Sequence, residues 1–391
     1  MSARRGHHPE GNTVKFKNVA VVGAFALTAT IALAGCANSS GDTGSTTKPS
    51  ASATADAYKI DPSLTGTITA GGSSAQANAE AAWVAAFTSQ AKGVTINYDK
   101  SQGSGGGVTN WLAGSYDFAG SDSPLNPTQV TSSASTCGAD GAINLPVYLD
   151  GVAVIYNLPG VKDLKLSSEV IAKIFSLKIT TWNDAAIVAL NPKAKLPATA
   201  ITTVTRSDGS GTTTNFTNYL SQSQPSIWTY APSNAWPVAG SSAQQGGSGV
   251  VNTVKAGEGT IGYADHSAIG DLSSAQIQAG TSKDYVAFSA EGASTAFAKA
   301  AVATPTTVEG DLSQKLDYTK LTDKSSYPIP LISYQILCKT FKSADQAKLT
   351  KAFVGYVASD IGQKIAAKNA GAAPIPAAML AKIAKSLADV K

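Results

Sequence analysis

Histidine, cysteine and charged residues are scarce in this 391-residue chain, which has three histidines, three cysteines and 14% charged residues. Two of the histidines, His7 and His8, lie close to the N-terminus, so His266 is the histidine left for the rest of the chain. A structural zinc site takes about four Cys, His or carboxylate ligands, typically at short spacings. The sparse Cys and His residues have no such spacing, and the sequence predicts no metal site and no cofactor.

The sequence also lacks nucleotide-binding motifs and the large positive charge that is typical of nucleic-acid binding. The chain contains neither GxxxxGK[ST] nor GxGxxG, the glycine-rich motifs of nucleotide-binding loops. The formal net charge is +4, from 30 Lys and Arg against 26 Asp and Glu. Four basic residues and one acidic residue lie within 1–35, which leaves 26 basic and 25 acidic residues for the remainder. A body so close to neutral argues against a nucleic-acid partner.

An apolar run near the N-terminus predicts export. Residues 19–34 are apolar apart from two threonines, a length that is short for a membrane span and typical of a signal-peptide core. The run ends in Leu33-Ala34-Gly35-Cys36, which resembles a lipobox, so we expect a lipoprotein signal peptide over 1–35 and lipidation of Cys36. An ordinary signal peptide or a short anchor is the alternative. The Arg4-Arg5 pair leaves twin-arginine export open beside the favoured Sec route.

The segment after Cys36 predicts a tether, and two cysteines remain beyond it. Residues 37–57 contain no aromatic residue and no aliphatic residue larger than alanine, so 36–63 is expected to be a flexible linker to a lipid-anchored domain. Outside the membrane, Cys137 and Cys338 favour a disulfide over a metal site. Two buried free thiols are the alternative.

Short apolar strands alternate with amphipathic segments from residue 64 onward. The pattern predicts strands at 64–70, 94–98, 116–120, 143–157, 201–206, 260–263 and 327–338. It predicts helices at 75–91, 168–175, 183–190, 212–220, 344–358 and 377–388, and a break in the chain at 246–249 before 250–255. This alternation favours an α/β fold with a largely parallel sheet.

Three Gly/Ser loops, 71–74, 101–107 and 207–212, lie between a predicted strand and a predicted helix. The first turn of a helix offers free N–H groups and partial positive charge, and glycine allows close approach to a ligand. Three such ends together, with Arg206 beside the last, would surround an oxyanion. The alternative is that these residues only cap helices and form turns.

Asp122 ends one of the predicted strands, beside a Ser/Pro turn. A carboxylate is useful in an anion site only if the anion carries a proton, because a carboxylate only accepts hydrogen bonds. Protonated phosphate meets that condition and sulfate does not. The alternative for Asp122 is a local turn or cap.

The quoted residues resemble the phosphate-binding protein of the bacterial phosphate ABC transporter, the PstS family, over nearly all of 64–391. The resemblance lies in Gly72-Ser73-Ser74-Ala75, Gly103-Ser104-Gly105-Gly106-Gly107-Val108, Asp117-Phe118-Ala119-Gly120-Ser121-Asp122 and Arg206-Ser207-Asp208-Gly209-Ser210-Gly211-Thr212. It implies phosphate contacts from Ser74, Ala75, Ser104, Asp122, Arg206, Ser210, Gly211 and Thr212, with Asp208 holding Arg206. Some members carry Phe where Ala75 stands, and the loop before Ser104 is one residue longer than in some relatives.

The resemblance also implies the fold, the location and the partners. The fold is α/β, a two-lobed periplasmic-binding-protein-like fold of type II, with mixed sheets flanked by helices and a hinge between the lobes. Lobe I would comprise 64–148 and 330–391, and lobe II 149–329. The expected protein is not an enzyme: on the outer side of the cell membrane, it delivers inorganic phosphate to the permease subunits of an ABC importer.

Competing functions are a secreted phosphatase or an adhesin on the same scaffold. The phosphatase has no metal set, and His266 has no Ser/Asp partner motif. Sulfate, molybdate and phosphate esters are the competing ligands. Asp122 argues against the first two, and an enclosed site argues against esters.

Overall fold

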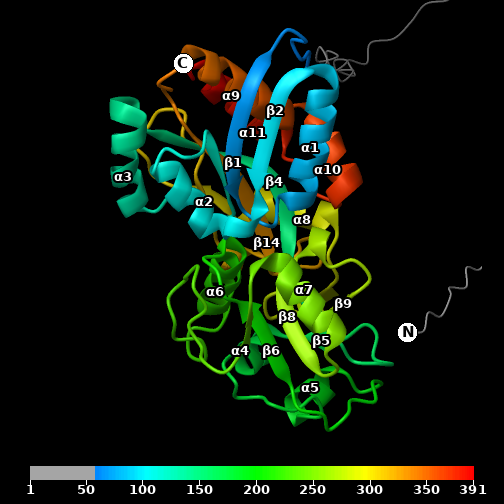
Figure 1. The fold of residues 1–391 in the computed structure, drawn as a ribbon. Coiled ribbons are helices and arrows are strands. Elements are labelled where there is room, and N and C mark those ends of the chain that lie inside the picture. Colours follow the sequence, from blue (N-terminus) through cyan, green and yellow to red (C-terminus); the bar gives the residue numbers. More distant parts are fainter. Residues whose placement is uncertain (1–57) are drawn as a thin grey trace, which may run out of the picture. The chain divides into compact units, whose positions relative to one another are not determined.

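The computed structural model describes residues 58–391 (Figure 1). The predicted signal peptide, the predicted lipidation residue Cys36 and the linker up to residue 57 lie outside the described residues. Within 58–391, no helix has both the length and the apolar character needed to cross a bilayer.

The main sheet runs through the centre of the described part of the chain. Its strand order is β2 (Gly93–Asp99), β1 (Thr65–Gly72), β3 (Phe118–Ser121), β14 (Pro330–Cys338), β4 (Ala142–Tyr156), β8 (Thr260–Asp265), β6 (Thr202–Arg206) and β7 (Ser242–Gln244). The two-residue strand β9 (Ser273–Ser274) pairs with the end of β4. Smaller sheets are formed by β5 (Lys165–Leu166), β10 (Gln276–Gln278) and β11 (Tyr285–Val286), and by β12 (Ala301–Ala303) and β13 (Gln314–Leu316).

Pairing in the main sheet is mixed, as the predicted fold class requires. Strand β1 is parallel to β2 and β3, and β6 is parallel to β7 and β8. In the centre, β14 is antiparallel to β3 and β4, and β4 is antiparallel to β8. The expectation of a largely parallel sheet is therefore wrong for the centre, because β14 brings the end of the chain back beside β3 in the opposite direction.

Strand β4 joins the two lobes. Its residues 142–151 pair with β14, and its residues 152–156 pair with β8. We call the part built on β1, β2, β3, β14 and 142–151 the first lobe, and the part built on 152–156, β6, β7 and β8 the second lobe (Figure 1). All 15 residues of β4 are buried, which explains the long apolar run in the sequence.

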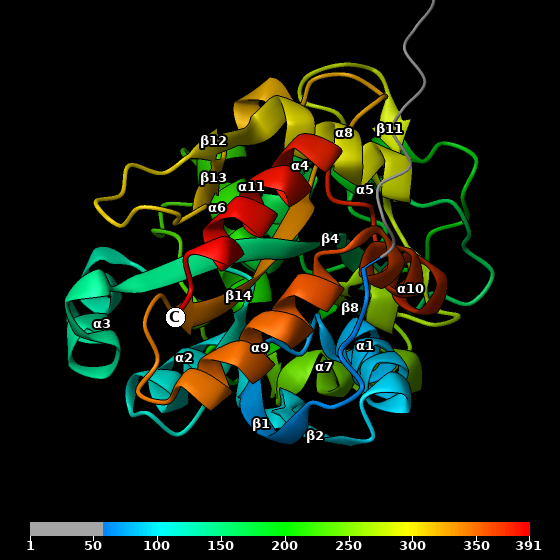
Figure 2. The ribbon, with the colours of Figure 1, turned by 90° about the horizontal axis from the view of Figure 1, so that it is seen from above.

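Helices flank the strands of each lobe. In the first lobe they are α1 (Ala77–Gln90), α2 (Gly103–Leu112), α3 (Pro127–Cys137), α9 (Ala344–Val357), α10 (Asp360–Ala370) and α11 (Ala377–Ala388), and Figure 2 shows α9 and α11 across the strands. In the second lobe they are α4 (Ser168–Phe175), α5 (Ala185–Leu190), α6 (Gly211–Ser223) and α7 (Gly246–Ala256). Helix α8 (Ala290–Ala300) packs against β4 and β14.

Several helices depart from the sequence expectation. The pattern does not reveal α3, α8 or α10, and the expected break at 246–249 is wrong, since these residues form the first turn of α7. Helix α3 is rich in Ser and Thr, which have low intrinsic helix propensity. Its start is fixed by a capping box, in which Asn126 and Gln129 bond to each other's backbone N–H groups. The predicted loop at 101–107 is instead a 3₁₀ turn, η1 (Lys100–Gln102), followed by the first turns of α2.

Aromatic side chains pack together in the core of each lobe. In the first lobe, Phe87 of α1 packs edge-on against Phe353 of α9, with ring centroids 5.4 Å apart. In the second lobe, Phe216 of α6 stacks on Tyr263 of β8 at 4.6 Å. Burial of such rings is worth several kcal/mol each, so the start of α6 is held firmly against β8.

Cys137 and Cys338 form a disulfide in this structure, with Cα atoms 5.0 Å apart. The bond joins the last residue of α3 to the last residue of β14. Because 201 positions separate the two cysteines, it ties the late return strand to an early helix of the same lobe.

Candidate anion-binding site

Four chain segments meet where the two lobes face each other. They are the turn after β1 (73–76), the start of α2, the end of β3 with Asp122, and the turn between β6 and α6 (206–212). Strands β1, β3 and β6 all end here, and carboxyl ends of strands are the usual place for a ligand in α/β proteins. The structure thus brings together residues that are more than 130 positions apart in the sequence.

Asp122 is the centre of the site and is 3% exposed. The Ser333 hydroxyl donates to Oδ1 at 2.6 Å, the Thr212 hydroxyl donates to Oδ2 at 3.0 Å, and the Ser73 hydroxyl also donates to Oδ1. A carboxylate offers about four lone-pair positions, so three donors leave about one for a further donor. Burial raises the pKa of Asp122, while the three hydroxyls and the charge of Arg206 act in the opposite direction.

Arg206 provides the positive charge of the site and is 3% exposed. Its Nε donates to Asp208 Oδ1 at 2.7 Å, and its Nη2 donates to Asp208 Oδ2. Burial raises the pKa of Asp208, but the hydrogen bonds and charge of Arg206 outweigh it and hold the pKa below its usual range. This two-point pairing fixes the guanidinium plane, as Asp208 was expected to do.

Helix α6 begins at the site. Its N-cap residue Ser210 is fully buried, and the Ser210 hydroxyl accepts a hydrogen bond from the Thr213 N–H at 3.1 Å. Gly211 and Thr212 are the first two helical residues, so their N–H groups are among those that a helix leaves without an internal partner. An anion at this end of α6 would be favoured by the helix dipole.

Glycines in α2 allow the helix to approach other backbone closely. A Cβ atom on Gly107 would lie 2.4 Å from the Cα of Gly72, so no side chain fits between α2 and β1. This packing requires glycine at 107 despite its low helix propensity, and the positive φ of 61° at Gly103 favours glycine where α2 begins. The Ser104 hydroxyl accepts from the Asp122 N–H at 3.1 Å.

The lobes are held together by hydrogen bonds around the site. The Gly105 N–H donates to Gly209 O at 2.8 Å, and Asn215 Nδ2 donates to Asp122 O at 2.6 Å. The Gly247 N–H donates to the Ser74 hydroxyl at 3.2 Å. Each of these bonds crosses from one lobe to the other, so the structure has the lobes closed on each other.

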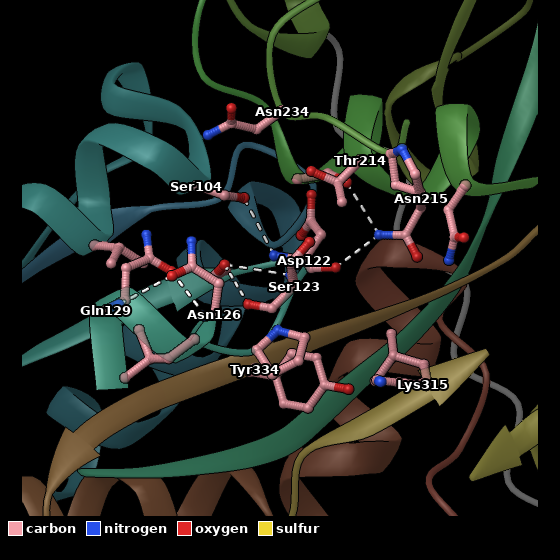
Figure 3. A pocket seen from close by; sticks show the side chains of 18 of the residues that line it. Ser104, Asp122, Ser123, Asn126, Gln129, Thr214, Asn215, Asn234, Lys315 and Tyr334 are labelled. Atoms are coloured by element: carbon pink, nitrogen blue, oxygen red, sulfur yellow. Dashed lines mark hydrogen bonds between the residues drawn. The ribbon is translucent and has the colours of Figure 1, made fainter. Parts of the chain in front are cut away.

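A cavity of about 540 Å³ adjoins the carboxylate (Figure 3). Ser104, Asp122 and Gly211 line it, together with amide side chains of both lobes, including Asn126, Asn215 and Asn234. Apolar side chains and Lys315 also line it, whereas Arg206, Ser210 and Thr212 do not line the cavity. Within residues 58–391, no cluster of three or more His, Cys, Asp and Glu side chains could hold a metal ion.

The chain is similar to known proteins that are named phosphate-binding proteins. The PBP superfamily domain matches residues 44–360. The phosphate-binding protein PstS 2 of Mycobacterium tuberculosis is 36% identical over 325 residues, which cover 81% of this chain and 85% of that protein. The phosphate-binding protein PstS 3 of Mycobacterium leprae is 35% identical over 292 residues, 74% of this chain and 78% of that protein. This chain belongs to the PstS family.

Solved structures agree with the PstS-family fold. A phosphate-binding protein from Stenotrophomonas maltophilia aligns with a TM-score of 0.63 and 21% identity, covering 82% of this chain and 93% of that one. The periplasmic phosphate-binding protein PfluDING, solved with bound phosphate, aligns with a TM-score of 0.64 and 23% identity over 81% of this chain and 93% of that one. The predicted family and the predicted two-lobed fold are both confirmed.

Most of the residues predicted to contact the ligand lie close together in the structure. They are Ser104, Asp122, Arg206, Ser210, Gly211 and Thr212, at the lobe interface. Ser74 faces α7 of the second lobe, and the Ala75 N–H donates to the Ser73 hydroxyl at 3.1 Å. The partners of Asp122 that the sequence did not suggest are Ser73, Ser333 and Asn215.

Proposed function

We propose that this chain is a phosphate receptor that captures inorganic phosphate between its two lobes. Its PstS relatives are named phosphate-binding proteins, and the structure of PfluDING holds phosphate. The residues proposed to contact the ligand are Ser74, Ala75, Ser104, Asp122, Arg206, Ser210, Gly211 and Thr212. The lobes that close on it are 64–148 with 330–391, and 149–329.

The observation that carries this proposal is the environment of Asp122. Hydroxyl groups, helix N–H groups and a guanidinium surround it, and all of these donate hydrogen bonds to an anion. Three hydroxyls already donate to the carboxylate, and this supports an ionised Asp122 that accepts one more hydrogen bond. Phosphate at neutral pH carries such a proton, whereas sulfate would place a bare oxygen against Asp122.

The receptor would serve an ABC importer. We infer that Cys36 carries a lipid that anchors the protein at the outer face of the cell membrane, and that permease subunits receive the phosphate. The protein itself performs no catalysis in this role. A phosphatase assay on chelator-treated protein is expected to show no turnover.

Titration calorimetry of ligand-free protein with phosphate and with sulfate tests the proposal. We expect phosphate to bind at least about 10³-fold more tightly, because each tenfold step needs only about 1.4 kcal/mol and an unpaired buried charge costs several. Sulfate affinity within tenfold of phosphate affinity at pH 7 would refute it.

A further inference from the structure

A buried polar network lies behind Asp122, on the side of the first lobe. Ser333 of β14 donates to Asp122 Oδ1 at 2.6 Å, and Gln76 Nε2 donates to the same Ser333 hydroxyl at 2.6 Å. Gln76 Nε2 also donates to Tyr334 O at 2.9 Å. Because Ser333 accepts from Gln76, its single proton is left for the carboxylate.

A second contact between the same two elements lies one helical turn further along α1. Glu80 Oε1 accepts from Gln335 Nε2 at 2.7 Å. Glu80 is 1% exposed, and Gln76 and Gln335 are fully buried. Gln76 and Glu80 are four positions apart, and the Glu80 N–H donates to Gln76 O at 2.7 Å. Ser333 and Gln335 alternate along β14, so the two contacts form adjacent rungs between α1 and β14.

Three acceptor oxygens of this network are buried and receive no hydrogen bond. They are Gln76 Oε1, Glu80 Oε2 and Gln335 Oε1. An ionised Glu80 would place a charge beside the amide of Gln335, and a buried charge without a cation is costly. A protonated Glu80 instead supplies a donor. A carboxylic acid and a primary amide can then pair through two hydrogen bonds, which satisfies Glu80 Oε2 and Gln335 Oε1 together.

The groups around Glu80 agree with a neutral acid. Burial raises the pKa of Glu80 to about 8, and the hydrogen bond from Gln335 lowers it by less. Tyr98 of β2 is the titratable group that faces it, with Asp122 beyond. The Tyr98 hydroxyl donates to Ser73 O at 2.9 Å, so its proton is already used.

We propose that Glu80 is a neutral positioning residue of the phosphate site, which acts through Gln335, Gln76 and Ser333 on the carboxylate of Asp122. Its paired acid and amide hold the start of α1 against β14. Gln76 is the last residue of the turn 73–76, and Ser333 contacts Asp122, so this attachment sets the turn and the carboxylate relative to each other. The inference rests on the proposed phosphate function.

Two substitutions separate positioning from simple packing. Glu80→Gln keeps an acceptor and a donor of the same shape, so it should pair with Gln335 and bind phosphate within about twofold of the wild type. Glu80→Leu removes both hydrogen bonds with Gln335. We expect about tenfold weaker phosphate binding and a reduced preference for phosphate over sulfate, since a lost hydrogen bond costs about one factor of ten. Calorimetry with both anions measures the affinities and their ratio.

The pH dependence of phosphate affinity gives a second test. It compares the wild type with Glu80→Gln and so does not need Glu80→Leu to fold. Phosphate ionises identically in both titrations, so the ratio of wild-type to Glu80→Gln affinity isolates the acid. We expect the wild type to lose affinity relative to Glu80→Gln as pH rises from 6 to 9.5. Infrared spectroscopy at pH 6 should show a protonated carboxyl band that is missing from Glu80→Gln.

Each outcome is decisive. A wild type that binds no phosphate refutes the proposed function, whatever the variants do. If the wild type binds phosphate, the positioning role is refuted by a folded Glu80→Leu with unchanged affinity and ratio. It is equally refuted by an affinity ratio between wild type and Glu80→Gln that stays constant from pH 6 to 9.5.

Discussion

Thr212 of the second lobe donates a hydrogen bond to Asp122 of the first lobe, with Oγ1 and Oδ2 3.0 Å apart and both side chains buried. The bond therefore joins the lobes at Asp122, the carboxylate that we propose accepts a hydrogen bond from protonated phosphate. Closure of the lobes and the hydrogen bonding of Asp122 are in this way connected through one hydroxyl.

Replacing that hydroxyl should weaken phosphate binding. Thr212→Val keeps the side-chain shape but removes a hydrogen bond to a charged group, worth about 1.5–3 kcal/mol. We expect phosphate affinity in calorimetry to fall by about one to two factors of ten. Thr88→Val is the control, because the Thr88 hydroxyl bonds to Val84 O at 2.8 Å within α1 and Thr88 does not line the cavity. Equal losses in both variants would contradict a special role for Thr212.

Asp122→Asn tests the selection of phosphate over sulfate. Asparagine can turn its NH₂ group toward an unprotonated oxygen, so the variant should keep some phosphate binding and lose much of its bias against sulfate. Competition calorimetry gives the ratio of the two affinities. Asp284→Asn changes one exposed carboxylate in the same way and should leave the ratio unchanged. A ratio unaffected in Asp122→Asn would show that this carboxylate is not the selector.

Arg206 should contribute to phosphate binding through the orientation of its guanidinium as well as through its charge. Arg206→Lys retains the charge but loses the two-point pairing with Asp208, so we expect weaker phosphate binding than in the wild type. Arg206→Ala should lose several kcal/mol of binding, because charge-assisted hydrogen bonds contribute about 1.5–3 kcal/mol each. Lys255→Ala removes one exposed charge of the same lobe and serves as the control. The assignment fails if Arg206→Ala binds phosphate as the wild type does.

Local patterns in the sequence predicted those parts of the molecule that local chemistry determines. Helices α4 and α11 have the predicted bounds, since their apolar periodicity marks one buried face. The family resemblance, and no local pattern, implied that Asp208 holds Arg206, and the two side chains are paired in the structure. Family resemblance also carried the two-lobed fold, while the phosphate contacts that it implies stay predictions.

Long-range packing decided the features that the sequence did not reveal. Whether Ser73 or Ser74 faces Asp122 depends on the turn after β1, and the structure turns Ser73 toward it. Ser333 reaches Asp122 from 211 positions away. Gly107 of α2 packs directly on Gly72 of β1, a long-range contact that glycine-rich composition alone does not indicate.

The disulfide should stabilise the fold without supporting the ligand site. Cys137 and Cys338 close a loop with a separation of 201 positions, for which the chain-entropy model gives about 5 kcal/mol. We expect the double Cys→Ser variant to lose up to that amount of unfolding free energy in urea, while binding phosphate as before. A reducing agent should destabilise the wild type and leave the variant unaffected. Equal stability of both proteins would argue against the bond in solution.

Burial of Glu80 should make the stability of the protein depend on pH in a way that Glu80→Gln does not. The pKa of Glu80 is raised to about 8 in the folded protein, while an unfolded glutamate titrates near 4.3, as a rough reference value. Between these values the folded state holds a proton that the unfolded state has lost. The contribution of Glu80 to the unfolding free energy is therefore largest below about pH 4, falls by at most about 1.4 kcal/mol per pH unit, and is constant above about pH 8.

Urea unfolding at pH 5 and pH 8.5 should show the wild type losing stability relative to Glu80→Gln. Glu291→Gln, an exposed glutamate in the first turn of α8, controls for the loss of a carboxylate. Parallel pH profiles for the wild type and Glu80→Gln would show that Glu80 is ionised in the folded protein.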